Sequence, residues 1–175
     1  MTDPRRDHVA LVGLSGAGKS TVAPLVAARL LVQVVDLDHE VEARSGSTVA
    51  ELFADGGEAA FRAEESAALA AALTGPPAVI ATGGGVVLDP SNRRALSDDA
   101  TTVWLRGDPG ELGARIADGV EARPLLEGDP VFALTRLAEE RDALYAEVAH
   151  EVVDVGGADP ATVAEEIAAR LGVGT

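Results

Sequence analysis

The chain has 175 residues, a length typical of one globular domain with its own core. Because 47% of the residues are hydrophobic but only 3% are aromatic, we expect a core of Ala, Val and Leu. The formal net charge of −15 argues against a nucleic-acid partner, since phosphate backbones attract basic surfaces. The lack of cysteine excludes disulfides and thiolate metal sites. Without a long apolar run or a signal-peptide core, we expect a cytoplasmic protein that makes no membrane contact.

Apolar runs typical of short strands alternate along the chain with longer segments of helical periodicity. The predicted strands are residues 8–12, 32–35, 78–82, 101–105 and 151–154. Three of the helices are predicted to begin at an Asp-Pro pair, because Asp caps a helix and Pro suits its first position. These pairs are Asp108–Pro109, Asp129–Pro130 and Asp159–Pro160. The alternation predicts a single domain over residues 1–175, with a five-stranded parallel sheet flanked by helices in a three-layer α/β fold.

The first predicted strand is followed by Gly13-Leu-Ser-Gly-Ala-Gly-Lys-Ser20, which fits the P-loop pattern G-x-x-x-x-G-K-[ST] and precedes a predicted helix. In such a loop, backbone N–H groups and the helix N-terminus bind phosphate. Lys19, the only lysine among 14 basic residues, would reach the β and γ phosphates, and Ser20 would bind Mg²⁺. The pattern therefore predicts a P-loop NTPase fold. Its predicted nucleotide-binding residues are Gly13, Ser15, Gly16, Ala17, Gly18, Lys19, Ser20 and Thr21.

Two further features follow predicted strands at the edge of the sheet where ligands of such folds bind. Asp36 and Asp38 suit Mg²⁺ binding or proton acceptance from an attacking hydroxyl, but they equally suit a helix N-cap and its acidic first turn. The glycines of residues 83–85 allow either a turn with positive φ or close approach of backbone N–H groups to a ligand. From the residues alone, both pairs of alternatives stay open.

Five sequence features occur in the order and at the spacing found in shikimate kinases. They are the P-loop, Asp36-Leu-Asp38, Gly57-Glu-Ala-Ala-Phe-Arg-Ala-Glu-Glu65, Gly83-Gly-Gly85 and Arg123-Pro-Leu-Leu126, with Arg141 and Tyr145 on a later helix. The chain resembles this family over almost its whole length. The resemblance implies a monomeric cytoplasmic enzyme that transfers the γ-phosphoryl group of ATP to the 3-hydroxyl of shikimate. The product would feed the pathway to chorismate and aromatic amino acids.

The resemblance also implies roles for residues on the substrate side, including helices over about residues 36–66. Asp38 would bind the accepting hydroxyl and act as its base, while Asp36 would lie near Mg²⁺. Arg62 and Arg141 would hold the shikimate carboxylate, because a planar guanidinium can pair with both of its oxygens. Glu65 would orient Arg62 from one helical turn away. The other implied substrate-binding residues are Phe53, Phe61, Gly83, Gly84 and Gly85, of which the two phenylalanines equally suit the core.

Residues 118–129 lack helical periodicity and resemble the mobile lid of these kinases. Arg123 would reach the transferring phosphate on lid closure and act in catalysis with Lys19 and Asp38. Pro124 and Leu125 would exclude water. Arg115 and Asp154 resemble residues of the family's adenine site, and with Arg123 they complete the implied nucleotide-binding set.

Two other functions stay open on the sequence. The P-loop also resembles those of adenylylsulfate kinases and gluconate kinases, but these families do not account for Arg62, the three glycines and Arg141 together. A non-catalytic ATP-binding regulator is the second alternative. Such a regulator would need no carboxylate at the acceptor position, so Asp38 argues for an enzyme.

Overall fold

The computed structural model of the chain describes residues 7–117 and 128–173. At its centre lies a five-stranded parallel sheet with the order β2-β3-β1-β4-β5. The strands are β1 (His8–Val12), β2 (Gln33–Asp36), β3 (Ala78–Ala81), β4 (Ala100–Arg106) and β5 (Glu151–Asp154). The five predicted strands are therefore confirmed, each to within one residue at either end.

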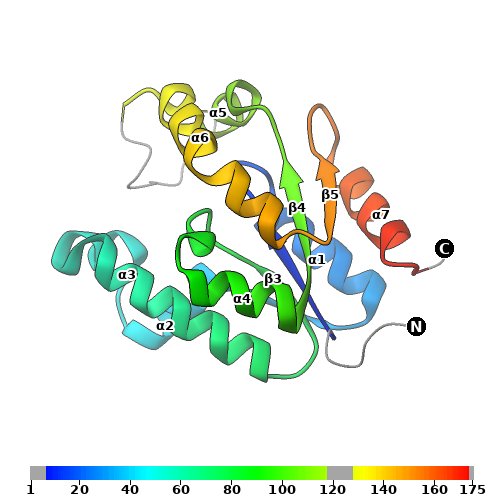
Figure 1. Ribbon diagram of the computed structural model, residues 1–175, viewed down its shortest axis with the longest axis horizontal. Helices are drawn as coiled ribbons and strands as arrows, with labels where there is room; N and C mark the ends of the chain where they lie inside the picture. The colour runs from blue at the N-terminus through cyan, green and yellow to red at the C-terminus, as the bar shows by residue number, and fades with distance from the viewer. Residues whose placement is uncertain (1–6, 118–127, 174–175) are drawn as a thin grey trace.

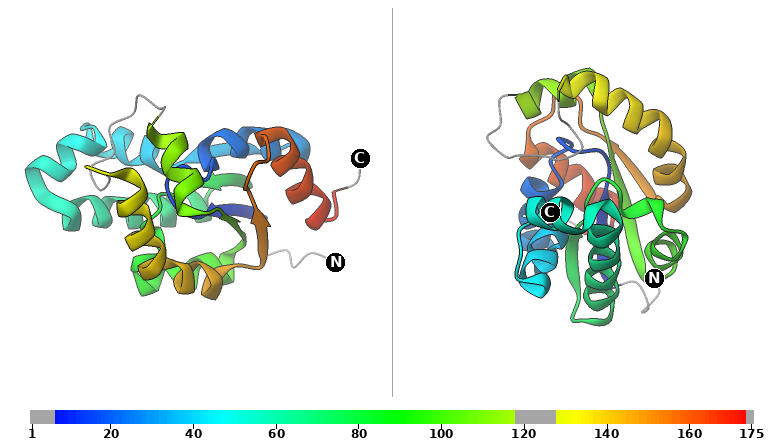
Figure 2. Two further views of the ribbon diagram at one scale, coloured as in Figure 1. Left: turned by 90° about the horizontal axis from the view of Figure 1, so that it is seen from above. Right: turned by 90° about the vertical axis from the view of Figure 1, so that its left-hand side faces the viewer.

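Helices cover both faces of the sheet (Figures 1 and 2), which confirms the predicted three-layer α/β fold. On one face lie α1 (Lys19–Leu30) and α7 (Pro160–Arg170), and on the other lie α4 (Pro90–Asp99) and α6 (Pro130–Val148). The helices α2 (Leu37–Ser45) and α3 (Val49–Thr74) pack together at one end of the molecule, and α5 (Pro109–Ala117) packs against α6. No helix in the described part of the chain is long and apolar enough to cross a membrane.

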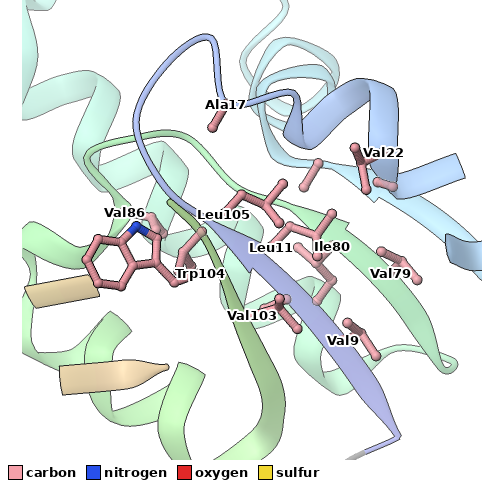
Figure 3. Close-up of a cluster of buried hydrophobic side chains, with 14 of the residues drawn as sticks. Val9, Leu11, Ala17, Val22, Val79, Ile80, Val86, Val103, Trp104 and Leu105 are labelled. Atoms are coloured by element: carbon pink, nitrogen blue, oxygen red, sulfur yellow. The ribbon is translucent and has the colours of Figure 1, made fainter. Parts of the chain in front are cut away.

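The core lies between the sheet and its helices and consists mainly of aliphatic side chains, as the composition predicts (Figure 3). Leu11, Ile80 and Leu105 come from three neighbouring strands and are completely buried. A parallel sheet covered on both faces requires such continuously apolar strands. The indole of Trp104 on β4 packs against the ring of Tyr145 on α6, with ring centroids 5.8 Å apart. These two large rings pack between the sheet and α6, together with smaller buried side chains of that helix.

Aspartates cap the helices that the sequence marks with Asp-Pro pairs. Asp129 and Asp159 accept hydrogen bonds from backbone N–H groups in the first turns of α6 and α7. Asp108 accepts from the N–H groups of Gly110 and Glu111 in α5. A fourth pair, Asp89–Pro90, starts α4 in the same way and carries the same signal in the sequence. Local sequence thus fixes where these helices begin.

The long helix α3 is broken at Gly57, whose φ of 70° and ψ of −174° lie outside the helical region. Glycine adopts this conformation readily because it has no Cβ. A new helical segment begins after the break and carries Phe61, Arg62 and Glu65. The break therefore lets this segment take its own direction, independent of the first turns of α3.

Candidate active site

A cleft of about 1050 Å³ opens beside the carboxyl ends of the parallel strands. This is the edge at which open parallel sheets bind their ligands. The predicted residues that line the cleft are Ser15, Gly16, Ala17, Gly18, Lys19, Ser20, Thr21, Asp36, Asp38, Phe53, Phe61, Arg62, Gly83, Gly84, Gly85, Arg115 and Arg141. Residues that are far apart in the sequence, and that were assigned to ATP, metal and acceptor, therefore share one cavity.

The P-loop connects β1 to α1, and its conformation depends on glycine. Gly13, Gly16 and Gly18 have φ values of 143°, 83° and 91°, which residues with a Cβ rarely adopt. Lys19 is buried, and its Nζ donates to the carbonyl oxygens of Gly13 at 2.6 Å and Leu14 at 2.9 Å. The ammonium group is thus held against the backbone of the loop.

Ser20 and Asp36 place two side-chain oxygens side by side at the start of α1. The Ser20 Oγ donates to Oδ2 of Asp36 at 2.6 Å, while Oδ1 of Asp36 accepts from the N–H of Asp38 and caps α2. Asp36 therefore caps a helix with one oxygen and faces the P-loop serine with the other. Hard oxygen ligands of this kind fit the predicted Mg²⁺. Within the described residues, no group of three His, Cys, Asp or Glu side chains is arranged to hold a metal ion.

The triple-glycine turn allows side chains to pack closely, and it does not need a left-handed backbone. None of its three glycines has a positive φ, and Gly85 has a φ of −97°. A Cβ at Gly83 would overlap Oε2 of Glu65, and a Cβ at Gly85 would overlap the guanidinium of Arg62. The alternative that these glycines serve a turn with positive φ is therefore wrong. Their missing side chains make room for Arg62 and Glu65.

Arg62 and Arg141 approach this turn from two different helices. Nη1 of Arg62 donates to Oε1 of Glu65 at 2.8 Å, as expected, and Nε and Nη2 both donate to Oε1 of Glu58 at 3.2 Å. Nη1 of Arg141 lies 3.6 Å from the position that a Cβ of Gly84 would take. The two guanidinium groups therefore lie against adjacent glycines of one turn.

Arg141 is buried in the cleft wall without an ion pair to a carboxylate of the described residues, although its charge lowers the pKa of the nearby Glu65. Its exposed fraction is 4%, and its Nε has no hydrogen-bond partner within the described residues. Among residues 7–117 and 128–173, no Asp or Glu forms an ion pair with it. A buried cation is costly unless an anion pairs with it. The position of Arg141 in the cleft wall therefore favours an anionic ligand.

Glu65 is completely buried beneath Arg62 and Gly83. Burial raises the pKa of its carboxyl, whereas the charge and hydrogen bond of Arg62 lower this pKa. Its Oε2 has no hydrogen-bond partner in the described part of the chain. The charge of Glu65 therefore depends on Arg62, just as the orientation of Arg62 depends on Glu65.

The predicted nucleotide and lid residues are only partly brought together. Arg115 lines the cleft and donates to the carbonyl oxygen of Val155 at 2.9 Å. Asp154 lies outside the cleft, where its two oxygens accept from Arg106 at 2.7 and 2.9 Å. Arg123, Pro124 and Leu125 lie outside the described residues, as does the rest of residues 118–127.

The positions of Phe53 and Phe61 fit both roles that the sequence allows, namely lining the substrate pocket and packing in the core. Their rings lie 4.9 Å apart between centroids, and both residues line the cleft. Phe61 is also part of the hydrophobic core, and Phe53 packs against that core. The pair forms an apolar wall of the cleft beside Arg62, whose guanidinium lies 5.1 Å from the centroid of the Phe61 ring.

Two residues of the site had no predicted role. Glu58 precedes Arg62 by four residues, a spacing that places both on one helix face and signals their ion pair. Tyr145 donates its hydroxyl to the carbonyl oxygen of Gly84, from a position 61 residues further along the chain. No local pattern predicts such a contact, because only tertiary packing brings the two residues together.

The fold and the cleft define a P-loop kinase that acts on a small anionic metabolite. The model of the shikimate kinase family matches residues 15–172. The chain is 47% identical over 140 residues to the shikimate kinase of Paramagnetospirillum magneticum, covering 79% of this chain and 71% of that protein. Its identity to the Thiobacillus denitrificans enzyme is 40% over 151 residues, covering 86% and 82%. The structure of a shikimate kinase from Acinetobacter baumannii in complex with shikimate has a TM-score of 0.89 and 33% identity, covering 94% and 93%. The chain belongs to the shikimate kinase family, which confirms the resemblance inferred from its sequence.

Proposed function

We propose that the protein transfers the γ-phosphoryl group of ATP to the 3-hydroxyl of shikimate, giving shikimate 3-phosphate. The convergence of Arg62 and Arg141 on the triple-glycine turn, beside the P-loop, carries this proposal. A P-loop alone does not define the acceptor, whereas two arginines at one turn select an acid. The shikimate bound to the A. baumannii relative supports the same acceptor.

On the phosphate side, the N–H groups of the P-loop bind the phosphates of ATP. Lys19 exchanges its contacts with the carbonyls of Gly13 and Leu14 for the β and γ phosphate oxygens. Ser20 and Asp36 would hold Mg²⁺, which when bound neutralises charge on those oxygens. Because phosphoryl transfer leaves the protein little covalent chemistry to perform, positioned positive charge supplies most of the catalysis.

On the acceptor side, Asp38 takes the proton of the 3-hydroxyl as it attacks. This carboxylate lies across the turn, with its Oδ1 3.7 Å from the position of a Cβ at Gly83. Arg62 and Arg141 hold the carboxylate of shikimate, and the N–H groups of Gly84 and Gly85 bind its oxygens. Fixing the acid at one end orients the ring, so that a single hydroxyl faces the P-loop.

The remaining assignments rest on the family resemblance. Arg123 closes with the lid of residues 118–129 and stabilises the transferring phosphate, while Arg115 lies at the adenine. Asp154 stays a prediction without support from its geometry, because its salt bridge with Arg106 directs it away from the cleft. We expect a monomer that works in the cytoplasm, where ATP is available.

The function is tested by measuring ADP release from the purified protein with shikimate, gluconate or adenylylsulfate offered separately. ADP release with shikimate alone is expected, and it should disappear when Mg²⁺ is chelated. The variant Lys19→Met, prepared identically, reports any contaminating kinase. Activity with gluconate alone would overturn the acceptor assignment. A lack of ADP with every acceptor would favour a nucleotide-binding regulator.

A further inference from the structure

Tyr145, the only tyrosine of the chain, is completely buried next to the cleft. It lies on α6 one helical turn after Arg141, and its hydroxyl donates to the carbonyl oxygen of Gly84. Burial raises the pKa of the phenol, whereas the charge and the hydrogen bond of Arg141 lower this pKa. The hydroxyl therefore lies between a cation of the acceptor site and the backbone of the triple-glycine turn.

The carbonyl that Tyr145 binds belongs to the same peptide group as the N–H of Gly85. A peptide group is planar, so a hydrogen bond at the carbonyl oxygen of Gly84 also fixes the direction of this N–H. The bond in addition polarises the peptide and makes the N–H a stronger donor. Glycine has more backbone freedom than any other residue, so a glycine turn gains most from such a restraint.

The far end of the turn is held by other groups. Nδ2 of Asn92 donates to the carbonyl oxygen of Val86 at 3.0 Å. Nη1 of Arg93 donates to those of Val87 at 2.8 Å and Leu88 at 3.2 Å. These bonds fix the short helix η1 (Val86–Leu88) independently of Tyr145. Because Gly83 O and Gly85 O also accept from Val86 N and Leu88 N, loss of the phenol hydroxyl would free only the Gly84–Gly85 peptide, without unfolding the segment that follows it.

The ring of Tyr145 is fixed by its packing. It packs at a tilt against Trp104, whose Cδ1 lies 3.6 Å from the position of a Cβ at Gly13, the first P-loop glycine. A Cβ at Gly84 would lie 3.6 Å from Gly13 O and from Ser15 N. The glycine turn thus abuts the P-loop, and the ring pair contacts both, through Trp104 at Gly13 and Tyr145 at Gly84.

We infer that Tyr145 is a positioning residue for the acid substrate: its hydroxyl locks the Gly84–Gly85 peptide so that the Gly85 N–H and Arg141 bind the same carboxylate. The inference rests on the proposed function. It assigns the hydroxyl a part in shikimate binding and none in ATP binding. A purely structural hydroxyl would instead affect stability and leave the Michaelis constants of both substrates unchanged.

Steady-state kinetics of Tyr145→Phe test the inference, because phenylalanine keeps the ring and its packing against Trp104. The KM for shikimate should rise about five- to tenfold, as expected for the loss of one net hydrogen bond, while the KM for ATP stays within twofold. The matched control is Thr102→Val, which removes another buried hydroxyl that donates to a backbone carbonyl, that of Leu96 at 2.8 Å. This control should lower the melting temperature without changing either KM.

A second measurement needs no substitution that endangers folding. Biosynthetic replacement of tyrosine by 3-fluorotyrosine labels position 145 alone, since the chain has one tyrosine. Its single ¹⁹F resonance should shift when shikimate is added, and shift less when a non-hydrolysable ATP analogue is added. A resonance that does not respond to saturating shikimate would overturn the inference.

The outcomes also separate this inference from the proposed function. If the wild-type protein does not phosphorylate shikimate, the proposed function fails and the role of Tyr145 fails with it. If the wild type is active, but Tyr145→Phe leaves the shikimate KM unchanged or raises both KM values equally, only the positioning role is overturned.

Discussion

The phosphate half and the acid half of the cleft are built in different ways. The phosphate half is one contiguous segment, residues 13–21, which uses backbone N–H groups and a single lysine. The acid half takes Arg62 from α3, a glycine turn that follows β3, and Arg141 from α6. A local pattern thus suffices to predict the phosphate site, whereas the proposed acceptor site depends on tertiary packing. Changes in the acid half should therefore affect shikimate while leaving ATP binding nearly intact.

The largest effect is expected where the two halves meet. Asp38→Asn keeps the shape of the side chain but removes the charge that we propose accepts the proton. Turnover should fall by about 10²- to 10⁴-fold, while ATP binding, measured by calorimetry, stays nearly unchanged. Asp98→Asn on the exposed side of α4 serves as the control. Unchanged turnover in Asp38→Asn would remove this residue from the mechanism.

The second-largest effect is expected from a test of whether the acid half depends on close packing between Gly85 and Arg62. Gly85→Ala would place a methyl group on the guanidinium of Arg62, so the shikimate KM should rise about tenfold to a hundredfold. Gly75→Ala is the matched control, since its φ is −85° and its Cβ would make only ordinary contacts, the nearest being Ala72 O at 3.4 Å. Equal KM values in these two variants would show that the turn tolerates a side chain.

Arg62→Lys separates the geometry of the arginine from its charge. Lysine keeps the positive charge but cannot form the planar fork that pairs with a carboxylate. Shikimate binding should weaken about tenfold and ATP binding much less, as measured by titration of each ligand. Arg44→Lys, at an exposed position of α2, controls for the chemistry of the substitution. Equal losses for shikimate and ATP would argue that Arg62 supports the whole cleft.

The smallest effect concerns the pH dependence of stability. Burial raises the pKa of Glu65 in the folded protein above its ordinary value of 4.5. At pH values between the ordinary and the raised pKa, the folded protein therefore keeps a proton that the unfolded chain has lost. Its stabilising contribution is therefore complete below the ordinary pKa and is lost as the pH rises through the raised pKa. The free energy of unfolding of the wild type, relative to Glu65→Gln, should decrease over this window in urea titrations. A relative increase with pH would contradict the assigned direction.

The contrast between the phosphate half and the acid half also explains which features could be predicted from the sequence. The strands follow from their apolar runs, and the helix starts follow from side chains such as Asp129 and Asp159, which cap within three residues. The P-loop is equally local. The acid half was identified through a family resemblance, because the contacts of Arg62 and Arg141 with the glycine turn join distant segments. The contact of Tyr145 with Gly84 spans 61 residues and leaves no periodic or spacing signal.

For two predicted features, the structure shows a partner that the local sequence does not reveal. The three glycines at residues 83–85 suggest a turn with positive φ, yet none of them has one. Their missing side chains instead leave space for Arg62 and Glu65. The resemblance assigns Asp154 to the nucleotide, which stays a prediction, and the structure pairs Asp154 with Arg106 of the adjacent strand, outside the cleft. In both cases, the partner lies on another element and is invisible in a local pattern.

The central claim is that Arg62 and Arg141 together recognise the carboxylate of the acceptor. The most direct measurement compares kcat/KM for shikimate with that for its carboxamide, in the wild type and in the double variant Arg62→Gln/Arg141→Gln, whose neutral side chains remove both positive charges. Two charge-assisted contacts predict a preference for the acid of about a hundredfold or more in the wild type, falling below about tenfold in the double variant. Equal use of both compounds by the wild type, or an undiminished preference in the double variant, would contradict the account.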